Sequence, residues 1–234
     1  MAENKGMFAG FSDETIQFMW GIRLNNRRDW FLEHKPVYLR SLYEPMKALG
    51  AEVQRRMLDK HPELELNLKV TRIYRDARRV KYGGLYKDHL WLVLHAPREG
   101  SWTPEPAFYF EARPEEYEIG LGYWCPKASF MARYRQKILR EPAKLETLAR
   151  RLNRQSVFQL EGAEYKRPKG EVSPLLKPWF NRKDLTISSV RSYEEESPFF
   201  GPELADEIFE SFQWLLPFYH WFKEIELEPE SNEA

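Results

Sequence analysis

The sequence predicts an α+β fold in which a mainly antiparallel sheet is flanked by N-terminal and C-terminal helices in a single domain. Apolar residues recur at helical spacing over the first 60 residues and again after residue 127, whereas the stretch between them alternates like β-strands. The strands follow one another instead of alternating with helices, which is typical of an antiparallel sheet. A chain of 234 residues is also a natural size for one domain.

Helical signals fill the N-terminal region. Ser12 is the predicted N-cap of a first helix, whose apolar face includes Met19, Trp20 and Leu24. A second, short helix is predicted at residues 30–36. A third carries Leu42, Met46, Leu49, Val53 and Met57 at spacings of four, three, four and four, and His61-Pro62 ends it.

Five strands are predicted in the middle and late parts of the chain. They are residues 64–71, 89–95, 107–112, 117–124 and 185–193. In the first, the even-numbered residues from Leu64 to Val70 form an apolar face, and Arg72 continues that parity. In the second, leucines form one face while His89 and Trp91 lie on the other.

Three later helices are predicted at residues 127–140, 142–153 and 202–225. The last one carries two apolar stripes, so it needs two partners. One interpretation sandwiches this helix inside a single subunit. The alternative is a homodimer formed through Trp214, Phe218 and Trp221. We expect an N-terminal arm at residues 1–11, one domain at 12–226 and an acidic tail at 227–234.

Charge is balanced overall but uneven along the chain. The 36 Lys and Arg residues equal the 36 Asp and Glu residues, so no net field attracts nucleic acid or an anionic membrane. Residues 69–89 carry seven basic and two acidic side chains, whereas residues 194–234 carry twelve acidic side chains and one lysine. We expect the acidic C-terminal segment to neutralise part of the basic patches.

The residues and motifs of the sequence argue against several classes of site. Cys125 is the single cysteine, which excludes an intrachain disulfide and a cysteine-based zinc site. His89 and His95 lie too far apart on one strand to share a metal, so no metal site is expected. No phosphate-loop, dinucleotide-binding or serine-hydrolase motif occurs. With no signal-peptide pattern, we expect a cytoplasmic protein, and the sequence identifies no cofactor.

The informative segment is residues 71–89, in which cations recur at Arg72, Arg75, Arg78 and Lys87. Guanidinium groups bind phosphate and carboxylate bidentately, so one hypothesis is a pocket for a small anionic ligand. The alternative is an interaction or structural protein whose arginines form internal ion pairs, with Asp76 or Glu111 as the partner of a buried Arg72. Either way, removal of Arg72 is expected to cost more stability than removal of Lys137.

Further residues are candidates for the same pocket. Tyr86 lies beside Lys87 in sequence, and Asp76 is expected to orient the arginines rather than act as a base. Asn26 and Trp30 are predicted either to line the pocket opposite the arginines or to serve as a helix cap and a core residue. The sequence names no catalytic residue and does not decide whether the protein is an enzyme.

A second basic stripe consists of Arg133, Lys137, Arg140 and Lys144. Its spacing places these residues opposite the apolar face of the helix at 127–140. Such stripes are usually solvated, and we keep weak nucleic-acid binding only as a third hypothesis.

Four segments carry a family resemblance: residues 24–38, residues 45–49, Arg72-Ile-Tyr-Arg-Asp-Ala-Arg78 with Tyr86-Lys87, and Gly120-Leu-Gly-Tyr-Trp-Cys-Pro126. In these segments the chain resembles a bacterial family of uncharacterised proteins, domain of unknown function 2461. The resemblance implies one domain and no established activity. The loop at residues 78–85 departs from the usual family pattern, whereas the flanking cations are retained.

Overall fold

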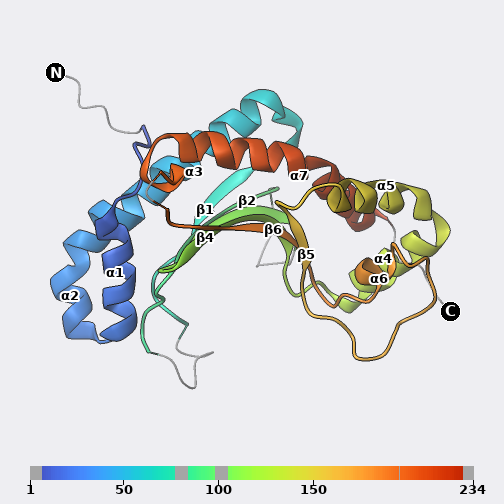
Figure 1. Cartoon of the computed structure of the whole chain (residues 1–234), viewed down its shortest axis with the longest axis horizontal. Coiled ribbons are helices and arrows are strands. Elements are labelled where there is room, and N and C mark those ends of the chain that lie inside the picture. The colour runs from blue at the N-terminus through green and yellow to red at the C-terminus, as the bar shows by residue number, and fades with distance from the viewer. Residues whose placement is uncertain (1–6, 77–83, 98–104, 195, 229–234) are drawn as a thin grey trace. The chain divides into compact units, whose positions relative to one another are not determined.

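The computed structural model describes residues 7–76, 84–97, 105–194 and 196–228 (Figure 1). Within them, six strands form one sheet in the order β1-β2-β3-β4-β6-β5. The strands are β1 (Asn67–Val70), β2 (Leu90–His95), β3 (Ala107–Ala112), β4 (Glu116–Tyr123), β5 (Gln159–Glu161) and β6 (Leu185–Ser192). The α+β class with a mainly antiparallel sheet is therefore confirmed.

The helices follow the sequence prediction closely. They are α1 (Asp13–Leu24), α2 (Arg28–Val37), α3 (Glu44–Lys60), α4 (Ala128–Arg140), α5 (Pro142–Asn153), α6 (Lys177–Phe180) and α7 (Glu203–Leu227). Ser12 is the N-cap of α1, as predicted. The predicted apolar face of α1 was partly wrong, because Trp20 and Leu24 are exposed while Phe18 and Ile22 are buried. The short elements α6 and β5 were not predicted.

None of the helices in the described part of the chain has the length and apolar character needed to cross a membrane.

The chain divides into two compact units. Unit 1 comprises residues 1–97, 109–119 and 190–211, and unit 2 comprises residues 98–108, 120–189 and 212–234. Strands β3, β4 and β6 and helix α7 contribute residues to both. The domain boundaries expected at residues 12 and 226 stay predictions.

In unit 1, helix α3 packs on strands β1 and β2, as Figure 1 shows. The packing is close at Gly50, where an added Cβ would lie 2.7 Å from a methyl carbon of Leu68. Helix α1 is held to the π-helical segment Tyr38–Tyr43 by the Thr15 hydroxyl, which donates to the carbonyl oxygen of Ser41 at 2.6 Å. These contacts give β1 and β2 a rigid support.

In unit 2, aromatic residues of α7 pack against aromatic residues of other segments of the same unit. Trp221 lies edge-on to Tyr134, with ring centroids 5.3 Å apart, and Trp214 stacks on Phe158 at 4.7 Å. Phe218 and Trp221 are 0% and 1% exposed. These two residues therefore do not form the exposed aromatic patch on which the predicted homodimer rested, and the homodimer stays a prediction.

Candidate functional site

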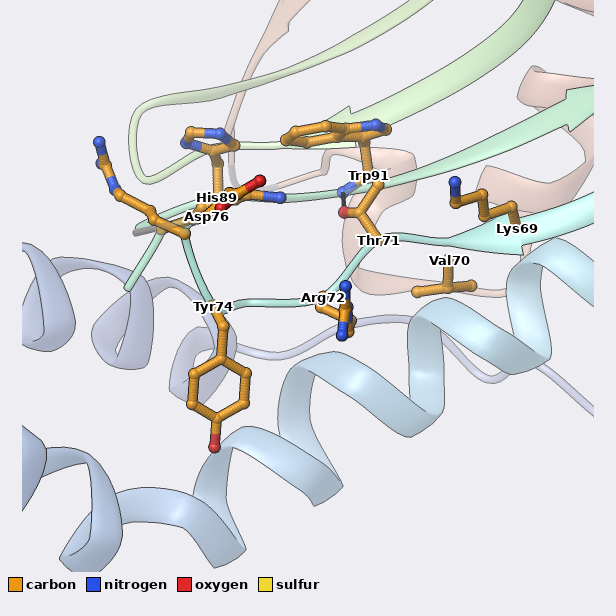
Figure 2. Close-up of a pocket in the computed structure, with 10 residues that line it drawn as sticks. Lys69, Val70, Thr71, Arg72, Tyr74, Asp76, His89 and Trp91 are labelled. Atoms are coloured by element: carbon orange, nitrogen blue, oxygen red, sulfur yellow. Dashed lines mark hydrogen bonds between the residues drawn. The ribbon is translucent and has the colours of Figure 1, made fainter. Parts of the chain in front are cut away.

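A cavity of about 540 Å³ lies in unit 1, along the segment that follows β1. Its lining comes from residues 69–76 and from the start of β2, and Figure 2 shows it. The lining residues are Lys69, Val70, Thr71, Arg72, Tyr74, Arg75, Asp76, Lys87, His89 and Trp91. We call this site the basic cavity, because four of these side chains are cationic and one is a carboxylate.

The backbone builds the basic cavity by extending the antiparallel pairing of β1 and β2. Beyond the end of β1, the Thr71 amide donates to the Trp91 carbonyl oxygen at 2.9 Å, and the Trp91 amide donates to the Thr71 hydroxyl at 3.3 Å (Figure 2). Farther along, the Lys87 amide donates to the Ile73 carbonyl oxygen at 2.7 Å. The pairing places residues 72–75 beside residues 85–89.

Arg72 does not occupy the buried position predicted for it. Strand β1 ends at Val70, and the buried residues beyond it are Thr71 and Ile73, while Arg72 is exposed. The alternation therefore shifts by one residue where the regular strand stops, which the parity argument did not allow for. Among the described residues, the Arg72 guanidinium has no hydrogen bond or ion pair within the usual distances.

Arg75 is held by the backbone and lies near one carboxylate. Its Nε donates to the Tyr86 carbonyl oxygen at 2.8 Å, and its Nη2 lies 4.0 Å from Oδ1 of Asp88. Asp88 is itself engaged, because Arg23 donates to it at 2.5 Å and His89 Nδ1 lies 2.8 Å away. Burial opposes ionisation of Asp88, but the hydrogen bonds from Arg23 and His89 outweigh it, so its pKa is lowered.

Lys87 is the half-buried cation of the basic cavity. Its Nζ lies 4.1 Å from the centroid of the Trp91 ring. Burial lowers the pKa of Lys87, and the charges of Arg75, Arg72 and Lys69 lower it further, while Glu111 acts in the opposite direction. Positive charge at this point of the structure is thus incompletely compensated.

Glu111 does not pair with Arg72 as one hypothesis proposed. Its partner is Arg113, whose Nη2 lies 2.7 Å from Glu111 and 2.5 Å from Glu118. Burial would lower the pKa of Arg113, but its carboxylate partners raise it overall. The Tyr109 hydroxyl donates to Glu118 at 2.5 Å and completes this cluster. Glu111 contacts the cavity lining at His89, whose Nε2 lies 3.7 Å from it.

Asn26 holds the backbone beside the basic cavity rather than lining it. Its amide nitrogen donates to the Tyr86 carbonyl oxygen at 2.8 Å, and its amide oxygen accepts from the Tyr86 N–H at 2.9 Å. Gly84, with φ of +76°, lies so close that an added Cβ would be 2.4 Å from the Asn26 side chain. The predicted helix cap was wrong, because the N-cap of α2 is Arg27.

Two more candidates lie away from the lining. Trp30 is half-buried, stacks on His34 with ring centroids 3.9 Å apart and also contacts Phe18. Tyr86 is buried, its ring stacks on Phe31 at 4.3 Å, and burial raises its pKa. Arg78 lies outside the described residues.

The structure thus brings together four of the nine predicted site residues, Arg72, Arg75, Asp76 and Lys87. It adds a wall that the prediction missed, in which His89 stacks on Trp91 with centroids 5.4 Å apart. The signal was present, because alternation placed both residues on one face of their strand. What was missing was the register that sets this face beside residues 69–72.

The second basic stripe, Arg133, Lys137, Arg140 and Lys144, lies in unit 2, where Arg140 and Lys144 are exposed as expected and Lys137 is not. Lys137 is buried, with Nζ 2.6 Å from Glu228, and Arg140 contacts the same carboxylate at 2.7 Å. Lys144 pairs with Glu224 at 2.5 Å. The expected neutralisation by the acidic C-terminal segment is confirmed at this stripe.

Comparison with known proteins places the chain in a family. No curated protein matches the chain. The pattern of a family described as conserved hypothetical protein (DUF2461) matches residues 14–221 and so spans most of the chain, including the basic cavity. The chain therefore belongs to this DUF2461 family of conserved hypothetical proteins.

Proposed function

We propose that the protein binds a small anionic ligand, carrying phosphate or carboxylate, in the basic cavity. The observation that carries this proposal is the charge of the lining, whose described residues include the cations Lys69, Arg72, Arg75 and Lys87 and one carboxylate, Asp76. Clustered cations of this kind destabilise one another unless an anion compensates them. A bound oxyanion would offset that repulsion, and an arginine matches its geometry.

Arg75 and Arg72 differ in how they could contribute to binding. Arg75 is fixed by its hydrogen bond to the Tyr86 carbonyl oxygen, so it offers its charge from a constrained position. Arg72 is exposed and has no ion pair among the described residues, so its guanidinium is available to a ligand. A ligand that enters from solvent could therefore meet the exposed Arg72 and be held by the constrained Arg75.

The volume and wall of the site favour a small molecule over nucleic acid. A cavity of about 540 Å³ falls in the range of small-molecule pockets. Nucleic acid needs several free cations along one face, whereas Lys137, Arg140 and Lys144 of the other basic stripe are already paired with carboxylates of the same unit.

Thermal unfolding with added inorganic phosphate, pyrophosphate or citrate tests the proposal. A ligand that binds the folded state raises the melting temperature with concentration, by mass action. We expect at least one of these anions to raise it at millimolar concentration, beyond the effect of chloride at matched ionic strength. The rise should be much smaller in Arg72→Ala.

Arg55→Ala is the matched control, because Arg55 is an exposed arginine of α3 that pairs with Asp59 at 2.8 Å, away from the cavity lining. Its anion response should equal that of the unmodified protein. Equal responses in Arg72→Ala and Arg55→Ala, or no response to any of the three anions, would remove the support for the basic cavity as a binding site.

A further inference from the structure

Lys87 differs from an ordinary surface lysine in three respects. It is half-buried, it lines the basic cavity, and its ammonium group rests over the Trp91 ring at 4.1 Å. Among the described residues, no carboxylate lies within ion-pair distance of its Nζ. The ammonium form therefore lacks the partner that usually holds a half-buried lysine in its charged state.

The cationic neighbours of Lys87 also oppose its charge, whereas Glu111 favours it. Arg75, Arg72 and Lys69 are close enough to oppose its positive charge, and burial opposes it more strongly, so the pKa of Lys87 is lowered. The cation–π contact with Trp91 favours the charged form, but such contacts are modest, about 0.5–2 kcal/mol. Desolvation and a neighbouring cation are the two means by which proteins activate a lysine amine as a nucleophile.

We propose, on the basis of the proposed anion site, that Lys87 is a reactive amine that forms an imine with a ligand carrying both a carbonyl group and a phosphate or carboxylate. Arg72 and Arg75 hold the anionic group of the ligand and so place its carbonyl carbon at the Lys87 amine. The ligand class is thus 2-oxo acids and phosphorylated aldehydes or ketones.

The chemistry balances without any further reactant. The neutral amine of Lys87 adds to the carbonyl carbon, the N–C bond forms, and a proton passes from nitrogen to oxygen through solvent water. Loss of one water molecule then breaks the C–O bond and leaves the C=N bond of the imine. No oxidant or reductant takes part, and hydrolysis reverses the step.

Pyridoxal 5′-phosphate and pyridoxal form a matched pair of probes, because both are aldehydes and only the first carries a phosphate. The full chain is incubated with each at neutral pH, the imines are reduced with borohydride, and the modified lysines are mapped by peptide mass spectrometry. With the phosphorylated probe, we expect Lys87 to be modified first and to the highest fraction. Arg72→Ala should lower that modification about tenfold and slow the reaction with pyridoxal by a smaller factor, because it also removes a charge that lowers the pKa of Lys87.

Lys87→Arg separates this inference from the proposed function, because it keeps the positive charge and cannot form an imine. We expect it to lose the dominant modification, while the melting-temperature response of the unmodified protein to inorganic phosphate tests the anion site separately. Modification spread over exposed lysines such as Lys47, with Lys87 no faster than they are, would overturn the inference. If phosphate still raised the melting temperature in that case, the anion site would stand without the reactive lysine.

Discussion

The two basic clusters of this chain look alike in sequence and differ in structure. In the stripe formed by Arg133, Lys137, Arg140 and Lys144, the last three cations pair with Glu228 or Glu224 near the end of α7. Burial of Lys137 is compensated by Glu228 at 2.6 Å. In the basic cavity, the described lining residues include four cations and one carboxylate, Asp76. We propose that the first cluster stabilises the fold, whereas the second binds a ligand.

The two clusters shift the pKa of their central lysines, Lys137 and Lys87, in opposite directions. Burial opposes the charge of both. At Lys137, the hydrogen bond that its Nζ donates to Glu228 and the charges of Glu228, Glu141 and Glu224 outweigh it, and the pKa is raised. At Lys87, neighbouring cations add to the effect of burial, and the pKa is lowered. The acidic residues that the fold places near a cluster of cations therefore decide its role. With carboxylate partners the cations form internal ion pairs, and without them the cations are available to bind an anion.

The largest effect on stability is expected at Lys137. Lys137→Ala leaves Glu228 without its closest partner, and we expect the free energy of unfolding to fall by about 2–3 kcal/mol, somewhat less than for a fully buried pair because Glu228 is partly exposed. Urea denaturation at neutral pH measures it. Lys47→Ala, which removes an exposed ion pair with Glu44, should change stability by less than about 0.5 kcal/mol.

The same variant has a pH signature. The pKa of Glu228 is lowered in the folded protein, so the stability that its ionised form contributes is present above the ordinary value of 4.5 and is lost as the pH falls through the lowered pKa. The stability gap between the unmodified protein and Lys137→Ala should therefore narrow at acid pH. A gap that stays constant down to pH 3 would mean that the ion pair contributes little.

A smaller loss is expected at Asn26, which supports the backbone of the basic cavity without lining it. Asn26→Ala leaves the N–H and carbonyl oxygen of Tyr86 without their side-chain partners and should cost about 1–2 kcal/mol. It should also weaken the response to phosphate, because the same segment carries Lys87. Gln17→Ala, at an exposed position of α1, serves as the control. Unchanged stability and unchanged phosphate response in Asn26→Ala would show that Asn26 does not hold this segment.

The helices and strands were predicted from the sequence more accurately than the face of each element on which a given side chain lies. Helix α5 has the predicted bounds, and the predicted strands differ from the observed ones by few residues, because periodicity and Pro or Gly signals are local. The burial of Arg72, by contrast, could not be predicted from its neighbours in sequence. Its burial depended on whether β1 continued beyond Val70, and pairing with residues 85–91 decides that, which alternation along one strand does not reveal.

Long-range partners were also beyond the sequence. Glu111 pairs with Arg113, two residues away on the same side of the chain, and not with the arginines of residues 72–78. The cations of the second stripe were expected in solvent, because the register of α7 against α4 has no local signal. The cluster Arg72, Arg75, Asp76 and Lys87 was found from sequence because its members are close along the chain as well as in space.

The smallest effect on stability is expected at Arg72, in contrast to the expectation from sequence. Arg72 is exposed and has no ion pair among the described residues, so Arg72→Ala should change the free energy of unfolding by less than about 0.5 kcal/mol. Relief of Lys87 from a neighbouring charge would act towards a gain. If urea denaturation showed a larger loss for Arg72→Ala than for Lys137→Ala, the division between a structural and an available cluster would be reversed.

The most direct test of that division is the pKa of Lys87 beside that of Lys137, measured by NMR titration of the lysine side chains, with Lys87→Arg and Lys137→Arg used to assign the signals. We predict that Lys87 titrates below the ordinary lysine value of 10.5 and Lys137 above it. Saturating phosphate should raise the pKa of Lys87 and leave that of Lys137 unchanged. A Lys87 that titrates at or above 10.5, with no response to phosphate, would contradict the account.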